Sequence, residues 1–253
     1  MTMFVERAPR GGHGPLQQRA ARSDLNIWAV VPVKELCEAK RRLSAIVPCH
    51  LMPDLVLAML EDVLAAVSRA DGIAGIAVVT VDQRVIRLAQ SYGARILTTE
   101  ARSGHTAAVA GAARLLAEEG IGGMMQLPGD IPLVTSDEIS QVLAAHGRAP
   151  SFTIVPSHDD LGSNTVVVSP PTAVPLTFGD NSFFPHLKTA ERHGIAPLVW
   201  RASGISHDID NPHDLYAFAE TAATTRTKAF LVANGFSSWP SQLELARRER
   251  ACA

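Results

Sequence analysis

Hydrophobic and polar positions between residues 25 and 224 follow two alternating patterns. Short apolar runs, typical of buried parallel strands, lie at 27–33, 75–81, 95–98 and 124–127. Each is followed by a segment with apolar residues at helical spacing or with helix capping signals, near 53–70, 82–92, 105–119 and 135–146. This alternation predicts an α/β fold with a mainly parallel central sheet and helices on both faces.

The pattern changes after residue 147. Two strands, at 152–155 and 165–168, are separated by a short polar loop, which favours a small antiparallel region over another parallel crossover. A helix to His193, a strand at 197–201 and a helix over 215–222 follow. We therefore predict a single domain over 25–224, a disordered tail over 1–24 and a helical extension over 225–253, where 242–250 is prone to form a helix.

Composition narrows the class of protein. The chain has 253 residues, 47% of them hydrophobic, and a formal charge of −2, which argues against a nucleic-acid binder. No apolar run approaches the ~20 residues needed to span a bilayer. The three cysteines, Cys37, Cys49 and Cys252, have no zinc or disulfide spacing. These features suit a protein of the reducing cytoplasm, where we expect this one to act.

One carboxylate follows the apolar run at 124–127. The strand breaks at Pro128 and Gly129, Asp130 comes next, and a capping box over 135–138 opens a helix. Asp130 should therefore lie at the carboxyl end of a strand, the edge of an open α/β sheet where ligands bind. An aspartate in an ordinary tight turn is the alternative.

A second acidic signal is the pair Asp208 and Asp210. Residues two apart in an extended segment point to the same side, so both carboxylates can face one way while Ile209 packs into the core. Together with Asp130 they would form a compact anionic site, and Mg²⁺ prefers such oxygen ligands. The alternative is that Asp208 and Asp210 only cap the helix that follows.

Other segments suit the binding of anions. Lys34, Lys40 and Arg42 follow the first strand and could neutralise a triphosphate, whereas Arg41 suits a solvated helix face. Glycines and hydroxyl residues at 102–108, 162–165 and 179–182 could hold phosphate or carboxylate, or form plain turns and caps. We interpret the histidines near these motifs as packed or exposed side chains; they are His105, His186 and His207. There is no phosphate loop of the P-loop NTPases and no dinucleotide fingerprint.

Six motifs occur in one order that resembles the guanylyltransferases of coenzyme F-420 assembly. They are Pro32-Val33-Lys34, Ala39-Lys40-Arg41-Arg42-Leu43, Leu127-Pro128-Gly129-Asp130-Ile131-Pro132, Gly162-Ser163-Asn164-Thr165, Phe178-Gly179-Asp180-Asn181-Ser182-Phe183 and the segment from Asp208 to Leu215. Members of that family have a GT-A-type nucleotidyltransferase fold. They join GTP to a small phosphorylated three-carbon acid and release diphosphate.

The resemblance implies a role for each matching position. Asp130, Asp208 and Asp210 would hold Mg²⁺ and, with Lys34, form the catalytic set. The nucleotide would be bound by Lys34, Lys40, Arg42, Gly104, Thr106, Pro128 and Gly129. The phosphorylated acid would be bound by Thr165, Gly179 and Ser182.

One departure from the family concerns base recognition. Many relatives have Gly-Leu-Asn where this chain has Gly104-His105-Thr106, and a threonine offers only a hydroxyl in place of an amide. This departure suggests a subgroup with its own acid preference, for which we favour 3-phospho-D-glycerate over 2-phospho-L-lactate or phosphoenolpyruvate.

Two other functions stay open at this stage. One is a different GT-A-type nucleotidyltransferase, of the sugar-phosphate or molybdopterin type, although the usual Gly-Gly-x-x-x-Arg loop is missing after the first strand. The other is a non-catalytic nucleotide sensor. The expected partners are GTP and the acid, without nucleic acid or membrane, and a homodimer is compatible with the sequence.

Overall fold

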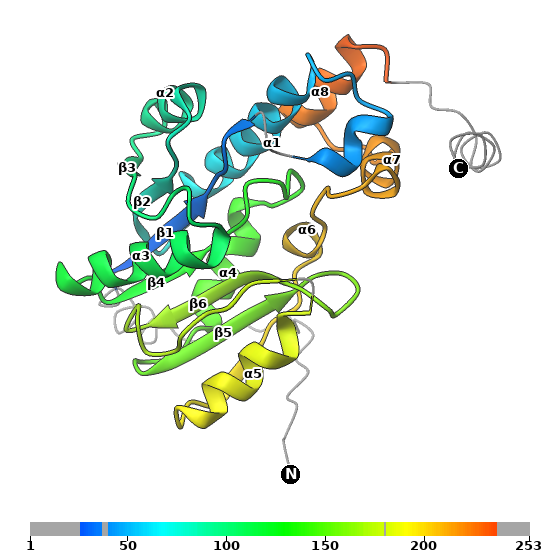
Figure 1. The fold of residues 1–253 in the computed structure, drawn as a ribbon. Coiled ribbons are helices and arrows are strands. Elements are labelled where there is room, and N and C mark those ends of the chain that lie inside the picture. The colour runs from blue at the N-terminus through cyan, green and yellow to red at the C-terminus, as the bar shows by residue number, and fades with distance from the viewer. Residues whose placement is uncertain (1–25, 37–39, 180, 237–253) are drawn as a thin grey trace.

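Seven strands form one mixed sheet in the order β3-β2-β1-β4-β6-β5-β7 (Figure 1). The computed structural model describes residues 26–36, 40–179 and 181–236. Within them β6 alone runs antiparallel to its neighbours, β4 and β5. The strands are β1 Ile27–Pro32, β2 Ile73–Val79, β3 Arg95–Leu97, β4 Gly123–Gln126, β5 Ser151–Pro156, β6 Ser163–Ser169 and β7 Pro197–Val199.

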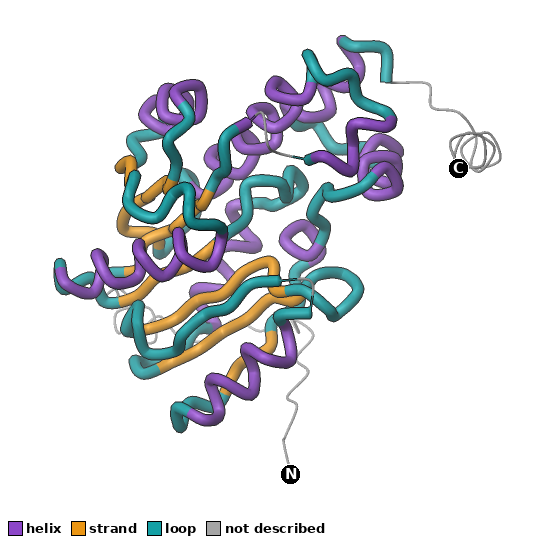
Figure 2. The backbone as a smooth tube through the Cα atoms, in the orientation of Figure 1, coloured by secondary structure: helices purple, strands orange, loops and turns teal. Residues whose placement is uncertain are grey.

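Helices cover both faces of this sheet (Figure 2). One hydrophobic cluster lies beneath α1, α2, α4, α7 and α8, and a second lies beneath α3 and α5. The helices are α1 Met52–Val67, α2 Gln83–Ser91, α3 His105–Glu118, α4 Ser136–Ala145, α5 Phe183–Arg192, α6 Ser203–Ser206, α7 Pro212–Glu220 and α8 Arg226–Ala233, with a 3₁₀ helix, η3, over Arg41–Ala45. The predicted α/β class and the helices on both faces are confirmed.

The order of the strands creates a crevice at one edge of the sheet. After β1, the strands β2 and β3 are added on one side of β1, and the chain then crosses to form β4 on the other side of β1. Connections that leave two neighbouring parallel strands in opposite directions open a space at the carboxyl ends of those strands. The residues that follow β1 and β4 therefore meet at this edge.

The predicted antiparallel pair forms, but it belongs to the main sheet. β6 pairs with β5 and also with β4, where Val166 lies opposite Gln126. Near its start β6 contains an irregularity, because Thr165 pairs with Val155 and Ser163 with Pro156. The residue between them, Asn164, has no partner, and such an extra residue re-aims a side chain at the end of a strand.

The helix that opens the predicted C-terminal extension packs on the domain. Asp62 of α1 accepts hydrogen bonds from the backbone N–H groups of Arg226 and Thr227, at 2.8 and 2.9 Å, and Leu231 of α8 is buried in the core. The expected tail over 1–24, the helix-prone segment 242–250, Cys37 and Cys252 lie outside the described residues. None of the described helices is long and apolar enough to cross a membrane.

Candidate active site

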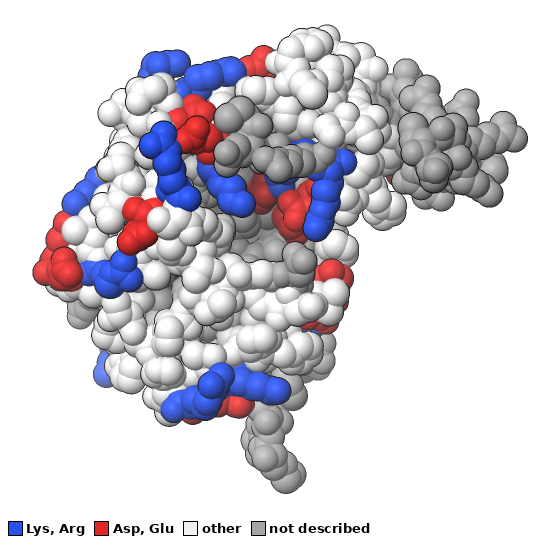
Figure 3. All heavy atoms as spheres, in the orientation of Figure 1, with Lys and Arg blue, Asp and Glu red and all other residues white. Residues whose placement is uncertain are grey.

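A cavity of about 1030 Å³ lies at the carboxyl ends of β1 and β4. Figure 3 shows basic and acidic side chains gathered along one side of this hollow. The cavity is where the strand order predicts a ligand site. Ten of the residues assigned from the sequence line it, namely Lys34, Lys40, Arg42, Pro128, Gly129, Asp130, Gly179, Ser182, Asp208 and Asp210.

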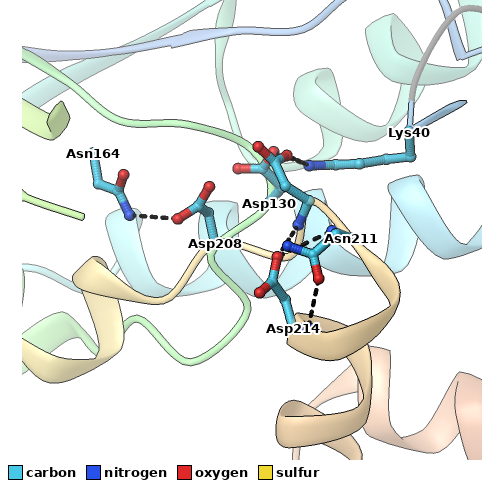
Figure 4. Close-up of polar contacts among 7 residues, drawn as sticks. Lys40, Asp130, Asn164, Asp208, Asn211 and Asp214 are labelled. Atoms are coloured by element: carbon cyan, nitrogen blue, oxygen red, sulfur yellow. Dashed lines mark hydrogen bonds and ion pairs between the residues drawn. The ribbon is translucent and has the colours of Figure 1, made fainter. Parts of the chain in front are cut away.

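Backbone contacts bring the two acidic segments together. The strand β4 ends at Gln126, and the backbone N–H of Ile209 donates to the carbonyl of Asp130 at 3.0 Å. The Ile209 side chain is 2% exposed and packs into the core, while Asp208 and Asp210 on either side line the cavity. The structure thus brings three carboxylates that are far apart in the sequence to one cavity (Figure 4).

Lys40 occupies the space between two of these carboxylates. Its Nζ bonds Asp130 Oδ2 and lies 2.6 Å from Asp210 Oδ1, and the Lys40 side chain is 9% exposed. Burial alone would lower the pKa of Lys40, but the charges of Asp130 and Asp210 outweigh it and raise the pKa. Burial acts to raise the pKa of Asp210, and the Lys40 ammonium reverses this and holds it below the usual range.

Asp208 is held from the opposite side. The Asn164 amide donates to Asp208 Oδ1 at 3.0 Å (Figure 4). It also donates to the carbonyl of Ile205 at 2.9 Å. Burial raises the pKa of Asp208, and the nearby charge of Asp130 adds to the rise. The charged form of Asp208 is therefore disfavoured unless a cation approaches. The sequence analysis gave Asn164 no role of its own. Its side chain reaches Asp208 because of the irregularity in β6, which the sequence does not reveal.

The three carboxylates do not form a ready metal cage. Within residues 26–36, 40–179 and 181–236, no group of three or more acidic, histidine or cysteine side chains is arranged to hold a metal ion. Yet Asp130 Oδ1 is buried without a hydrogen-bond partner. A buried carboxylate oxygen without a partner is costly and suits a cation. The donor set therefore fits a divalent ion once the Lys40 ammonium leaves Asp130 and Asp210.

Two positions assigned to the nucleotide lie elsewhere. Gly104 starts α3 with φ 92° and lines a small side pocket beside the cavity. The hydroxyl of Thr106 accepts a hydrogen bond from the backbone N–H of Phe178 at 3.0 Å. Thr106 does not line the cavity. Gly104 and Thr106 therefore do not line this cavity, and Thr106 anchors the loop that leads to Gly179. Their assignment to the nucleotide stays a prediction.

Thr165, assigned to the acid, also fails to line the cavity. Its side chain is fully buried, and its Oγ1 has no hydrogen-bond partner. It pairs with Val155 and is two residues from Val167, both of which belong to the core on the α1 side of the sheet. Its position on the strand therefore directs the hydroxyl towards the core on that side of the sheet. The assignment of Thr165 to the acid stays a prediction.

Two polar cavity residues were left without a role by the sequence analysis, the buried Gln126 and the half-buried His105. Gln126 is 1% exposed, its Oε1 has no partner, and its Nε2 lies 3.5 Å from Nε2 of His105. Burial lowers the pKa of His105 to about 4, so this ring is neutral near pH 7. A lone glutamine at the end of an apolar strand, just before Pro128, is the sequence signal that could have identified Gln126.

A buried hydrogen-bond network adjoins Ser182. The backbone N–H of Ser163 donates to Ser182 Oγ at 3.1 Å, and the two hydroxyls are 3.2 Å apart. Ser163 Oγ lies 2.9 Å from Nδ1 of His186, whose Nε2 accepts from the backbone N–H of Thr177 at 2.9 Å. The interpretation of His186 as a packed side chain is confirmed, and it contacts a cavity residue.

Comparison with known proteins places this site in a family. The chain is 36% identical to a phosphoenolpyruvate guanylyltransferase of Rubrobacter xylanophilus, over 76% of this chain and 92% of that protein. It is 30% identical to a 2-phospho-L-lactate guanylyltransferase of Methanothermobacter thermautotrophicus, over 87% and 97%. A nucleotidyl transferase from the same organism shares the fold, with a TM-score of 0.55 and 18% identity over 82% of this chain and 98% of that one. Residues 27–251 match the model described as "Guanylyl transferase CofC like", and the chain belongs to that family.

Proposed function

We propose that this chain is a guanylyltransferase that joins GTP to a small phosphorylated three-carbon acid and releases diphosphate. The observation that carries the proposal is the cavity at the ends of β1 and β4, in which three carboxylates face Lys34, Lys40 and Arg42. The same expectation follows from membership in the guanylyltransferase family.

The cavity is large enough for two ligands. Single drug-sized ligands occupy roughly 300–1,000 Å³, and this cavity measures about 1030 Å³. Its cations follow β1, whereas Ser163, Gly179 and Ser182 lie on the side of β6 and α5. We assign the triphosphate to the cationic side and the acid to the hydroxyl-rich side.

The chemistry needs no side-chain base. A phosphate oxygen of the acid is already anionic at neutral pH, and it attacks the α-phosphorus of GTP. The new bond forms as the bond from the α-phosphorus to its bridging oxygen breaks, and diphosphate leaves with that electron pair. Lys34, Lys40 and Arg42 would stabilise the charge that develops on the leaving group. In the same cavity His105, with a pKa of about 4, is neutral and adds no positive charge near pH 7.

Mg²⁺ is the cation that we propose for the acidic site. Asp130, Asp208 and Asp210 would hold it, since Asp130 Oδ1 has no partner, and burial together with the charge of Asp130 disfavours the ionised form of Asp208 unless a cation is near. When bound, such an ion neutralises charge on the phosphates. The ammonium of Lys40 would then move from the two carboxylates to the triphosphate, so that Lys40 bonds an anion in both states.

Two acids are the leading candidates. The relatives described above are named for phosphoenolpyruvate and for 2-phospho-L-lactate. Neither is named for 3-phospho-D-glycerate, which we favoured from the sequence, so that preference gains no support. We propose phosphoenolpyruvate first, because the relative that is 36% identical carries its name.

A substrate panel tests the function. Purified full-length protein is incubated with GTP, Mg²⁺ and either one of the three acids or a sugar phosphate, and released diphosphate is measured together with the mass of the guanylylated product. We expect release that depends on GTP, Mg²⁺ and one acid, and no release when the acid is omitted. Tight GTP binding without release for any acid would favour a sensor, and release only with sugar phosphates would favour the sugar-nucleotide class.

Thr106→Val tests the reassignment of Thr106. The valine keeps the shape of the side chain but removes the hydroxyl that accepts from Phe178 N–H. Loss of one such bond, at ~1 kcal/mol, should loosen the loop to Gly179 and raise the KM for the acid about fivefold. The KM for GTP should stay at its wild-type value. It should also stay at that value in the control Thr172→Val, which changes an exposed threonine. A rise in the KM for GTP alone would restore Thr106 to the nucleotide site.

A further inference from the structure

The feature with no role so far is the hydrogen-bond chain that runs from Thr177 through His186 to the cavity. It links a backbone N–H, an imidazole and the hydroxyls of Ser163 and Ser182, each step between 2.9 and 3.2 Å. His186 is 1% exposed, Ser182 5% and Ser163 9%, and the two serines also line the cavity. A chain of this kind at the wall of a ligand site fixes the direction of its hydroxyls.

The backbone N–H of Thr177 sets the tautomer of His186. A backbone N–H can only donate, so the Nε2 that receives it, at 2.9 Å, carries no proton. The ring is neutral near pH 7, because burial lowers the pKa of His186 to about 4. Its single proton is therefore on Nδ1, and Nδ1 donates to Ser163 Oγ at 2.9 Å.

This tautomer leaves one hydroxyl proton of the serine pair free. Ser163 Oγ accepts from His186, and Ser182 Oγ accepts from the backbone N–H of Ser163. The bond between the two hydroxyls then uses one of their two protons, whichever way it runs. With Ser182 as the donor in that bond, the proton of Ser163 is the free one. The pair thus presents an O–H donor to the cavity.

We propose that the hydroxyl of Ser163 donates to an anionic oxygen of the phosphorylated acid, and that His186 is a positioning residue that directs this proton into the cavity. The inference deepens the proposed function and rests on it. Ser182, assigned to the acid from the family resemblance, then supports Ser163 rather than being the sole contact. If Nδ1 instead lacked its proton, the ring would accept the proton of Ser163 and the donor to the acid would be lost.

Kinetics of variants at two residues, Ser163 and His186, test the inference. Ser163→Ala should raise the KM for the acid by at least about tenfold, the loss expected for a hydrogen bond to a charged oxygen, with the KM for GTP unchanged. His186→Phe should raise the same KM, and His186→Gln should restore part of it, because a glutamine amide can both accept from Thr177 and donate to Ser163. His146→Gln is the matched control, since His146 is also buried and bonds Thr153 and Ser169 away from the cavity.

A second readout does not depend on folding of the variants. Long-range ¹H–¹⁵N spectra of wild type should show His186 with its proton on Nδ1 at pH 7. A proton on Nε2, or an unchanged KM for the acid in folded Ser163→Ala, would overturn this inference. The proposed function would still stand in that case, provided that the wild type turns over GTP and the acid. If wild type releases no diphosphate with any acid, the proposed function and this inference are both overturned.

Discussion

Asp130→Asn and Asp208→Asn are each expected to reduce turnover by at least about a hundredfold while the fold stays intact. In Asp130→Asn the buried Oδ1, which has no partner, loses the charge that would attract a divalent ion. In Asp208→Asn the amide can still pair with Asn164, but the third negative charge is gone.

The two variants should differ in stability. Burial and the charge of Asp130 raise the pKa of Asp208, so ionised Asp208 opposes folding near pH 7. Removing that charge should leave the melting temperature unchanged or raise it. Asp130→Asn instead leaves the buried ammonium of Lys40 with Asp210 as its remaining carboxylate partner and should lower the melting temperature.

Metal binding separates these effects from a general loss of charge. Mn²⁺ titration followed by electron paramagnetic resonance should show weaker binding in both variants than in wild type. Asp137→Asn, an exposed aspartate in the first turn of α4, serves as the control and should match wild type in turnover and Mn²⁺ affinity. Turnover near that of wild type in both active-site variants would refute the metal assignment.

The fold and the acidic part of the site could be predicted from the sequence because both depend on local patterns. Apolar runs bounded by capping signals mark the strands and helices. The positions of these elements along the chain do not depend on the order of the strands in the sheet. Asp130 follows the end of β4 after three residues, and Asp208 and Asp210 flank Ile209, which is buried as the two-residue spacing requires. A residue at the carboxyl end of a parallel strand must lie at the edge of the sheet where ligands bind.

The contacts that the sequence did not predict are those in which a side chain had a choice of partner. Thr106 lies at the expected helix start, but its hydroxyl bonds the backbone of Phe178, 72 residues further along the chain. Thr165 lies on the expected strand, and the irregularity beside it decides which residue, Thr165 or Asn164, reaches the cavity. Lys40 was expected near phosphates, and its ammonium pairs with the carboxylates of Asp130 and Asp210. Contacts between distant segments settle each case, and no local pattern encodes them.

Gly204→Ala is expected to impair the enzyme through the backbone that carries Asp208. A Cβ on Gly204 would lie 2.3 Å from the carbonyl oxygen of Leu133 and 2.3 Å from Glu138 Oε2, closer than real Cβ atoms approach. The backbone N–H of Gly204 also donates to Glu138 Oε1 at 2.7 Å, which ties α6 to the start of α4. The alanine must therefore push α6 away from α4, and Asp208 follows α6 by two residues.

The expected losses are about 1–3 kcal/mol in the free energy of unfolding and, because a displacement of ~1 Å can reduce catalysis by about 10²-fold, a fall in kcat of that order. Denaturant unfolding gives the first quantity, and diphosphate release well below the melting temperature gives the second for folded protein. Ser203→Ala is the matched control, because Ser203 is the exposed neighbour on the same turn and its hydroxyl is 3.5 Å from Glu138. Wild-type kcat in folded Gly204→Ala would show that the contact of α6 with α4 does not position Asp208. A lowered kcat with an unchanged KM for the acid is the result that we expect if the added Cβ displaces Asp208 and leaves the acid-binding side of the cavity intact.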